Sequence, residues 1–279
     1  MTVAVIGIGL IGGSMALALK EKGFAKTVIG VDSNEEHCRK ALELKLVDEI
    51  AAIEEATDRS DLIVVAIPVN AAEKLLPAIL DRINRQVVMD VGSTKEGIIA
   101  SIVGHRNRKR FVATHPMWGT EYSGPEAAIS NAFAHKAAVI CNMEESDNDA
   151  VELVQRIYGE LQMHLLYMDA SAHDLHAAYV SHISHITSFA LANTVLEKER
   201  EEDTIFELAS GGFESTVRLA KSNPSMWVPI FMQNRENVLD VLNEHISQLR
   251  KFKSCLEREN YDYLRELIEN ANKIRRILK

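Results

Sequence analysis

The side chains best suited to chemistry in this 279-residue chain are His115 and Ser93, each of which follows a short apolar run. His115 comes after FVAT and opens HPMWGTEYSGP, whereas Ser93 lies in DVGSTK. A histidine titrates near neutral pH, so His115 can accept a hydroxyl proton as a hydride leaves the same carbon. The alternative is a strand-end histidine bonded to the backbone. The Ser93 hydroxyl either orients the histidine or the substrate, or caps a helix over 95–103 with Glu96 completing a capping box.

Arg218 is a candidate for binding an acidic substrate. It lies in SGGFESTVRLAKSNPSMW, on a predicted helix that follows a Gly-Gly turn. A guanidinium group presents paired N–H donors that match a carboxylate. The alternative is a surface or interface ion pair, and Arg235 is a weaker candidate of the same kind.

Four histidines lie on the helix predicted over 171–200, at positions 173, 176, 182 and 185. At about 100° per residue, His173 and His182 are predicted to point to opposite sides, whereas His182 and His185 are about 60° apart. An HxxH pair without a third ligand is a poor zinc pattern, so we expect no metal. A histidine among apolar neighbours here is either a core residue or a polar donor in a substrate pocket.

A glycine turn at the amino end of the chain predicts a dinucleotide site. Gly7, Gly9 and Gly12 fit GxGxxG between an apolar strand and a helix whose amino terminus offers free N–H donors to phosphates. Asp32 follows at the expected offset of about 20 residues, and its carboxylate favours NAD over NADP. We expect the cofactor to contact Gly7, Gly9, Leu10, Ile11, Gly12, Asp32, Ile67 and Pro68.

The elements that must position these residues fall into two halves. Residues 1–168 alternate apolar strands with helices, which indicates a Rossmann-type, mostly parallel sheet in an NAD-binding domain. Residues 169–279 are predicted to form an all-helical substrate and dimerisation domain. The predicted strands are 3–6, 28–31, 62–67, 87–91, 111–114, 137–141 and 164–168. The predicted helices of the second half are 171–200, 204–210, 213–222, 224–257 and 261–278.

Composition excludes several classes of protein. The chain has 47% hydrophobic and 25% charged residues, as an ordinary globular protein does. A net charge of −9 argues against a nucleic-acid partner. The uncharged run over 3–19 is too short and too rich in glycine for a membrane span or signal peptide. Three widely spaced cysteines support neither a disulfide framework nor a zinc site, so we expect a cytoplasmic location.

These motifs resemble those of the prephenate dehydrogenases and their arogenate-using relatives of tyrosine biosynthesis. The glycine turn is followed in order by DVGSTK, HPMWGTEYSGP, SHISH and SGGFESTVRLAKSNPSMW, which together span nearly the whole chain. HPMxGxExSG combined with SHxxH is specific, whereas the glycine turn alone is not. The resemblance implies oxidative decarboxylation, in which prephenate and NAD give 4-hydroxyphenylpyruvate, carbon dioxide and NADH.

The same resemblance assigns roles to individual residues. His115 deprotonates or hydrogen-bonds the substrate hydroxyl with the assistance of Ser93. Arg218 and His185 are expected to hold the anionic groups of the substrate. Glu121 matches an acid near the pocket mouth and is expected to act as a gate.

Within HPMWGTEYSGP, Gly119 and Thr120 are also expected to contact the substrate. The chain departs from the family pattern at Trp118, where a small residue is usual. It departs again at Ser215 and Val217, where the family often has Asp and Thr. These departures bear on the gate and on the shape of the pocket. The length leaves no room for a fused chorismate mutase or a separate regulatory domain.

Three other activities fit the sequence less well than prephenate dehydrogenation. The sequence favours prephenate over arogenate because His185 suits a keto acid and no unpaired acid is evident for an ammonium group. A 3-hydroxyacid dehydrogenase would carry a helix Lys with an Asn four residues later, whereas here Lys198 lies at the far end of the helix. A non-catalytic NAD sensor would not need Ser93, His115 and Arg218 at one crevice. The apolar faces of helix 171–200 further predict a homodimer.

Overall fold

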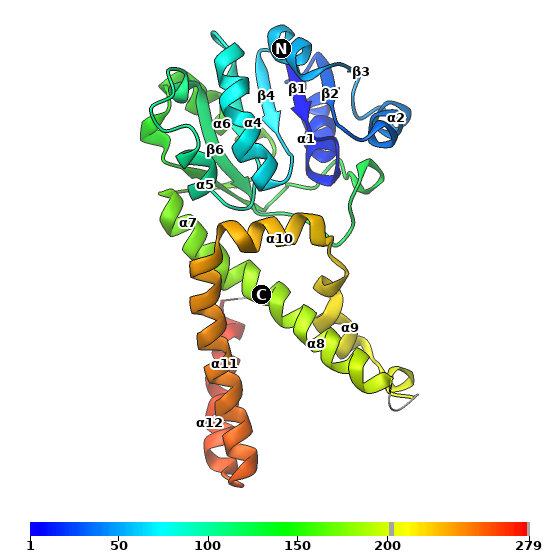
Figure 1. Cartoon of the computed structure of the whole chain (residues 1–279), viewed down its shortest axis with the longest axis vertical. Helices are drawn as coiled ribbons and strands as arrows, with labels where there is room; N and C mark the ends of the chain where they lie inside the picture. The colour runs from blue at the N-terminus through cyan, green and yellow to red at the C-terminus, as the bar shows by residue number, and fades with distance from the viewer. Residues whose placement is uncertain (201–203, 278–279) are drawn as a thin grey trace. The chain divides into compact units, whose positions relative to one another are not determined.

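The computed structural model describes residues 1–200 and 204–277. Its centre is one eight-stranded sheet with the order β3-β2-β1-β4-β5-β6-β7-β8, shown with its helices in Figure 1. All neighbouring strands are parallel except β6 and β7, which run antiparallel. The predicted Rossmann-type fold is confirmed. The strands are β1 Thr2–Ile6, β2 Thr27–Val31, β3 Glu49–Ile50, β4 Leu62–Val65, β5 Val87–Asp90, β6 Phe111–Pro116, β7 Ala137–Cys141 and β8 His164–Met168.

The sheet is buried on both faces, as alternate residues of β1 show. Val3 and Val5 join one hydrophobic cluster, whereas Ala4 and Ile6 join a second cluster on the opposite face. Helices α1 and α6 contribute to the first cluster and helices α3, α4 and α5 to the second. Parallel strands covered in this way read as continuous apolar runs. These helices are α1 Leu10–Glu21, α3 Ile53–Arg59, α4 Val69–Arg82, α5 Glu96–Ala100 and α6 Asn148–Glu160, and α2 is Glu35–Glu43.

The chain after the sheet is helical, with more interruptions than predicted. The helix expected over 171–200 is divided by a π-helical turn, Ala178–His182. The helix expected over 224–257 is divided at Asn234, and the helix expected over 204–210 is reduced to one 3₁₀ turn, Phe206–Leu208. Leu278, at the end of the last predicted helix, lies outside the described residues. The observed helices are α7 Ala170–Ala177, α8 Ile183–Glu199, α9 Gly211–Val217, α10 Pro224–Gln233, α11 Arg235–Glu257 and α12 Tyr261–Asn272.

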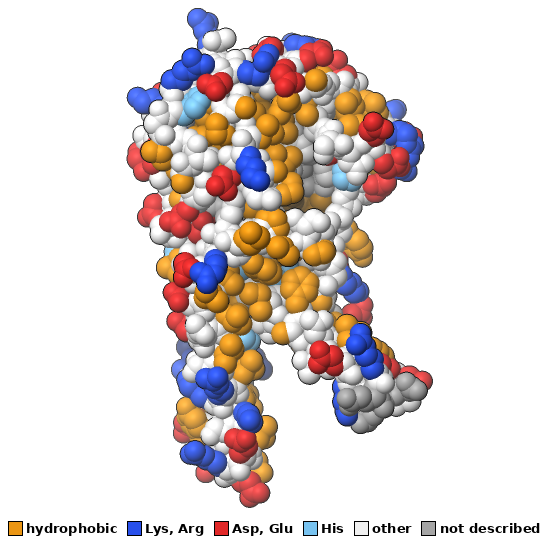
Figure 2. Space-filling view, in the orientation of Figure 1, with side chains coloured by type: hydrophobic (Ala, Val, Ile, Leu, Met, Phe, Trp, Pro, Cys, Tyr) orange, Lys and Arg blue, Asp and Glu red, His pale blue; other side chains and the backbone are white. Residues whose placement is uncertain are grey.

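Two compact units divide the chain, Met1–Asn234 and Arg235–Lys279. In the first unit, α10 packs against α4, and its Trp227 and Ile230 belong to the second hydrophobic cluster. The opposite side of α10 is exposed, and Figure 2 shows hydrophobic side chains gathered over it. The second unit is the pair α11 and α12, which pack against each other. The predicted domain boundary between residues 168 and 169 stays a prediction.

Candidate active site

The glycine turn connects β1 to α1 and is shaped for a phosphate group. Gly7 has φ +92°, and a Cβ there would lie 2.4 Å from the Ala66 carbonyl oxygen. A Cβ on Gly12 would lie 1.9 Å from the carbonyl oxygen of Gly7, so α1 can approach β1 only without a side chain. A Cβ on Gly9 would meet nothing within 4 Å, and no side chain caps the helix that follows. The turn therefore combines open space with free N–H donors, which suits a pyrophosphate.

Asp32 lies beside this turn at the end of β2. Its Oδ2 accepts the Ile8 N–H at 3.0 Å and its Oδ1 accepts the Asn34 N–H at 2.9 Å. The carboxylate is thereby fixed next to the glycine turn, as a partner of the adenosine ribose must be. Ile67 and Pro68 follow β4, and Ile67 adjoins Gly7. Leu10 and Ile11, in the first turn of α1, are half-buried.

His115 lies in β6, and its side chain is 9% exposed. Its Nδ1 is 2.9 Å from Nε2 of His173 on α7, and Nδ1 of His173 is 2.7 Å from Oδ1 of Asp174. Burial lowers the pKa of His115 well below its ordinary value, and the electrostatic effects of His173, Lys95 and His182 act in the same direction. His115 is consequently a neutral imidazole at neutral pH, the form that accepts a proton.

Ser93 lies in the loop after β5, at the same edge of the sheet as His115, and is half-buried. The predicted capping role is wrong, because α5 begins at Glu96 and has no side-chain cap from Ser93. The carboxylate of Asp174 accepts the first N–H groups of this helix instead, from Lys95 at 2.8 Å and Glu96 at 3.0 Å. Within the described residues, no hydrogen bond joins Ser93 to His115.

Arg218 and Glu121 meet at the other end of the site. Nη1 of Arg218 lies 2.7 Å from Oε2 of Glu121, a residue of the loop after β6. Half of the Arg218 side chain is exposed, whereas 13% of Glu121 is. A bond from its own backbone N–H, with the Arg218 ion pair, lowers the pKa of Glu121. One N–H of the guanidinium is used in this pair, and its remaining donors can bind a second carboxylate.

His182 and His185 both contact Trp227 of α10. His185 stacks on the indole with ring centroids 3.4 Å apart, and His182 meets it edge-on at 6.0 Å. Burial lowers the pKa of His182 to about 4, and burial also lowers the pKa of His185, which lies near enough to Arg218 to be affected by its charge. The part of the site formed by His182, His185 and Trp227 is therefore uncharged. The Nε1 of Trp227 is buried and has no hydrogen-bond partner among the residues that the structure describes.

The predicted directions of the histidines on the helix expected over 171–200 are wrong in one respect. His173 and His182 do not point to opposite sides, because Asn234 donates to the Asp174 carbonyl at 2.6 Å and approaches Nδ1 of His182 at 3.1 Å. The π turn between them adds a residue to one turn and changes the phase of the helix by about 100°. The two histidines consequently lie on the same side of the site.

Comparisons with known proteins agree with this geometry. Two family models match the chain, described as the nucleotide-binding domain of prephenate dehydrogenase over residues 15–167 and its dimerization domain over 169–270. The chain belongs to the prephenate dehydrogenase family. A prephenate dehydrogenase of Bacillus subtilis is 30% identical over 98% of this chain and 75% of its own length. A cyclohexadienyl dehydrogenase of Zymomonas mobilis is 29% identical over 99% of this chain and 96% of its own.

A solved structure of the prephenate dehydrogenase family agrees over the whole fold. The prephenate dehydrogenase of A. aeolicus, in complex with hydroxyphenyl propionate and NAD+, matches with a TM-score of 0.90 and 29% sequence identity. The match covers 100% of this chain and 98% of that chain. The family predicted from the motifs is confirmed.

The departures from the family pattern lie at the margins of the site. Trp118 packs its ring edge-on against Phe133, with centroids 5.5 Å apart, and is directed toward the first hydrophobic cluster. Ser215 is exposed and bonds the carbonyl of Gly212 at 3.0 Å. In the loop with Trp118, Gly119 is exposed and Thr120 accepts the N–H of Tyr122 at 3.2 Å.

Sequence reasoning missed the residues behind His115. His173 was considered only as a metal ligand, and Asp174 and Lys95 were not singled out. Lys95 is fully buried, where its ammonium group contacts the carboxylate of Asp90 and donates to the Thr114 carbonyl at 2.7 Å. The available signal is a lysine that follows an aspartate by five residues just after an apolar strand, as in DVGSTK.

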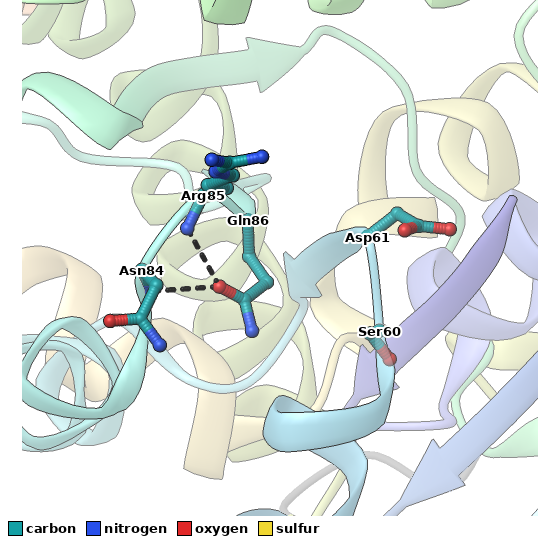
Figure 3. Close-up of a pocket in the computed structure, with 5 residues that line it drawn as sticks. All are labelled: Ser60, Asp61, Asn84, Arg85 and Gln86. Atoms are coloured by element: carbon teal, nitrogen blue, oxygen red, sulfur yellow. Dashed lines mark hydrogen bonds between the residues drawn. The ribbon is translucent and has the colours of Figure 1, made fainter.

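A separate hollow of about 360 Å³ lies at the amino ends of β4 and β5 (Figure 3). There the Gln86 side-chain oxygen accepts the N–H groups of Asn84 and Arg85. The glycine turn and His115 lie at the carboxyl ends of their strands, where ligands of such sheets bind. The hollow is therefore not part of the candidate active site. Its lining residues are Ser60, Asp61, Asn84, Arg85 and Gln86.

Proposed function

We propose that this chain catalyses the NAD-dependent oxidative decarboxylation of prephenate to 4-hydroxyphenylpyruvate. Nε2 of His115 takes the hydroxyl proton as the ring carbon that bears the hydroxyl loses its hydride, for which a bound NAD would be the acceptor. The dienone so formed loses its ring carboxylate as carbon dioxide, and the bonding electrons complete an aromatic ring. The protonated His115 then returns its proton to the phenolate oxygen, so that no net proton is released.

The observation that carries this proposal is the state of His115. It is a buried, neutral imidazole on β6, in the same carboxyl-end crevice that the glycine turn and Asp32 open onto. A general base must be unprotonated at the working pH, and its low pKa ensures that. Ser93, in the adjacent loop, is assigned to orient the substrate hydroxyl.

The anionic groups of the substrate are assigned to the opposite end of the site. Arg218 supplies a guanidinium fork. The ring of His185, whose Nδ1–H donates to the Ser181 carbonyl at 3.1 Å, is proposed to form the uncharged wall beside it. Glu121, which stays paired with Arg218, is proposed to act as a gate at the mouth of the pocket. Gly119 and Thr120 are proposed to form the adjoining wall.

NAD is the cofactor that these residues fit. Gly9 leaves space for the pyrophosphate, the uncapped start of α1 supplies donors, and Asp32 supplies an acceptor for the ribose hydroxyls. A second phosphate on that ribose would face the Asp32 carboxylate. When bound, the nicotinamide supplies the hydride acceptor.

Prephenate is proposed over arogenate because of the ion pair at the pocket mouth. Arogenate carries an ammonium group, for which a free carboxylate would be needed, and Glu121 is already bound to Arg218. The test is NADH formation measured in parallel with the two substrates. We expect a higher kcat/KM with prephenate. A higher value with arogenate would reverse the specificity, and no NADH from either would overturn the function in favour of a 3-hydroxyacid dehydrogenase or an NAD sensor.

We also propose a homodimer formed through the helical segment. Large apolar side chains of this segment are exposed in the single chain, and these are Leu175, Tyr179, Val180 and Leu196 on α7 to α8 and Met226, Val228 and Met232 on α10. Exposed apolar area of this kind is typical of an interface. The family model for residues 169–270 is described as a dimerization domain, which supports the predicted division into residues 1–168 and 169–279.

The location proposed is the cytoplasm, where the three free cysteines would stay reduced. A helix able to cross a bilayer does not occur among residues 1–200 and 204–277. The acidic net charge of −9 supports a small-molecule substrate rather than nucleic acid.

A further inference from the structure

We propose that His173 and Asp174 are positioning residues that hold His115 in the tautomer whose Nε2 is free to accept the substrate proton. The three side chains form a continuous hydrogen-bonded chain, with links of 2.9 Å and 2.7 Å. All are buried, and His173 and Asp174 are each 2% exposed. The proposal rests on the proposed function of His115 as the base.

The direction of the hydrogen bonds is determined at Asp174. Its Oδ1 accepts the Lys95 N–H and its Oδ2 accepts the Glu96 N–H, and a backbone N–H can only donate. A carboxylate in this position acts as an acceptor at both oxygens. The third bond to the carboxylate is consequently donated by Nδ1 of His173.

Each bond then determines the next one along the chain. A neutral imidazole with its proton on Nδ1 has an acceptor at Nε2, so His173 accepts from Nδ1–H of His115. His115 in turn keeps its lone pair on Nε2. If Nε2 of His173 instead donated to Nδ1 of His115, a neutral His115 would carry its proton on Nε2. It could not then act as a base at that atom.

The groups around the chain favour this arrangement. The buried ammonium of Lys95 and the ring of His182 disfavour a positive charge on His115, and Asp90 balances the charge of Lys95. The amide of Asn234 donates to the Asp174 carbonyl and so fixes the turn of α7 that carries both positioning residues. The chain thus connects β6, α7 and the start of α5, and a neutral His173 gives its two hydrogen bonds a single polarity.

The direct test is ¹⁵N NMR of the histidine rings in the ligand-free, full-length protein. The His115 signals are assigned by their loss in His115→Asn. We expect a protonated Nδ1 and an unprotonated Nε2 for His115 at pH 7.5, with the same tautomer for His173. A protonated Nε2 on His115 would overturn the proposal without any assay of activity.

Two substitutions at His173 separate positioning from packing. His173→Phe keeps the ring volume and removes both nitrogens, so His115 loses its acceptor and we expect kcat to fall by about 10- to 100-fold with little change in the KM for NAD. His173→Gln lacks the ring but can donate to Asp174 and accept from His115 with the same polarity. We therefore expect His173→Gln to recover at least part of the lost kcat.

The control is His176→Phe, an exposed histidine on the same helix, for which we expect kcat within twofold of the unmodified chain. If His173→Phe retained full kcat, or exceeded His173→Gln, His173 would be a packing residue and the proposal would be wrong. Failure of the proposed function would give a different result. The unmodified chain would then form no NADH from prephenate or arogenate, whichever tautomer the NMR spectra show for His115.

Discussion

At the scale of single residues, the site is a buried base whose neighbours oppose its protonation. Lys95 and His182 lie near His115 and oppose its protonation, while its Nδ1 is engaged by His173. The ring is therefore neutral over the whole range in which most enzymes are assayed. Protonation, which would remove the base, requires a pH below its lowered pKa.

Replacing the base tests this directly. His115→Asn should lower kcat by about 10²-fold or more and leave NAD binding intact, the usual scale for a lost general base. In the unmodified chain, kcat/KM should stay level as pH falls through 6.5, because the pKa of His115 lies well below that value. Stopped-flow or steady-state NADH formation from pH 5 to 8 measures both. A fall in kcat/KM centred at pH 6.5 or above would contradict the lowered pKa of the buried His115.

Arg218 is expected to act on substrate binding. Arg218→Ala should raise the KM for prephenate by about 10-fold or more, since a hydrogen bond to a charged group contributes about 1.5–3 kcal/mol. The matched control is Arg235→Ala, because Arg235 is exposed and its carboxylate partner is the adjacent Glu236. A KM within twofold of the unmodified chain for both variants would remove Arg218 from the substrate site.

Asp32 is expected to set the cofactor preference. Asp32→Ala removes the carboxylate that would repel the extra phosphate of NADP, so the ratio of kcat/KM for NAD to that for NADP should fall by about 10-fold or more, equivalent to about 1.4 kcal/mol. Initial rates with the two cofactors give the ratio. If the unmodified chain already preferred NADP, the argument from Asp32 would fail.

The residues that could be predicted are those whose signal is local. Gly7, Gly12 and Asp32 obey a fixed spacing, and His115 follows a recognisable strand. His173 acts through a residue 58 positions earlier in the chain. Nothing in its own neighbourhood reveals that contact, which exists only after β6 and α7 have packed.

At the scale of elements, a buried ion pair connects β5 to β6. The Lys95 ammonium contacts Asp90 at the end of β5 and the Thr114 carbonyl in β6, and Asp90 also accepts the Thr114 N–H at 3.1 Å. These bonds place His115, the next residue of β6, relative to the loop with Ser93. The pair holds two strands of the site in register.

Breaking this pair should be costly. Lys95→Met leaves the buried Asp90 carboxylate without a counter-charge, and the free energy of unfolding should fall by about 3–5 kcal/mol. Urea denaturation followed by circular dichroism measures the change. Lys136→Met, an exposed lysine just before β7, should change it by less than about 0.5 kcal/mol. Equal stability of the two variants would show that the pair is dispensable.

Most strands could be predicted, because buried parallel strands are short apolar runs with polar ends. β3 was missed, since two residues carry no periodicity. Helix interruptions were also missed. The π turn has the composition of an α-helix, and Asn234 ends α10 in a sequence that otherwise continues an apolar helical pattern.

At the scale of the whole molecule, exposed apolar side chains of the helical segment are the basis of the proposed homodimer. Val180 is 67% exposed and Met232 is 71% exposed. The sequence indicates apolar faces on this segment, and the fold of one chain leaves part of them in contact with water. The proposed homodimer would remove this surface from water.

Sedimentation equilibrium tests the dimer. The chain of 31.1 kDa should sediment at about twice that mass, and Val180→Glu should shift it toward the monomer because a charge would be buried in the interface. Val103→Glu is the control, since Val103 is 76% exposed on the sheet-bearing part of the chain. A single 31 kDa species for the unmodified chain would contradict the proposal.

The π turn at Ala178–His182 also determines how this enzyme could change during evolution. It adds one residue to the helical segment that carries His182 and His185 beside Trp227. Deleting Val180 would restore regular i to i−4 hydrogen bonding and rotate every later side chain of α8 by about 100°. A chain shortened in this way would gain a regular helix and lose the contacts of both histidines with Trp227.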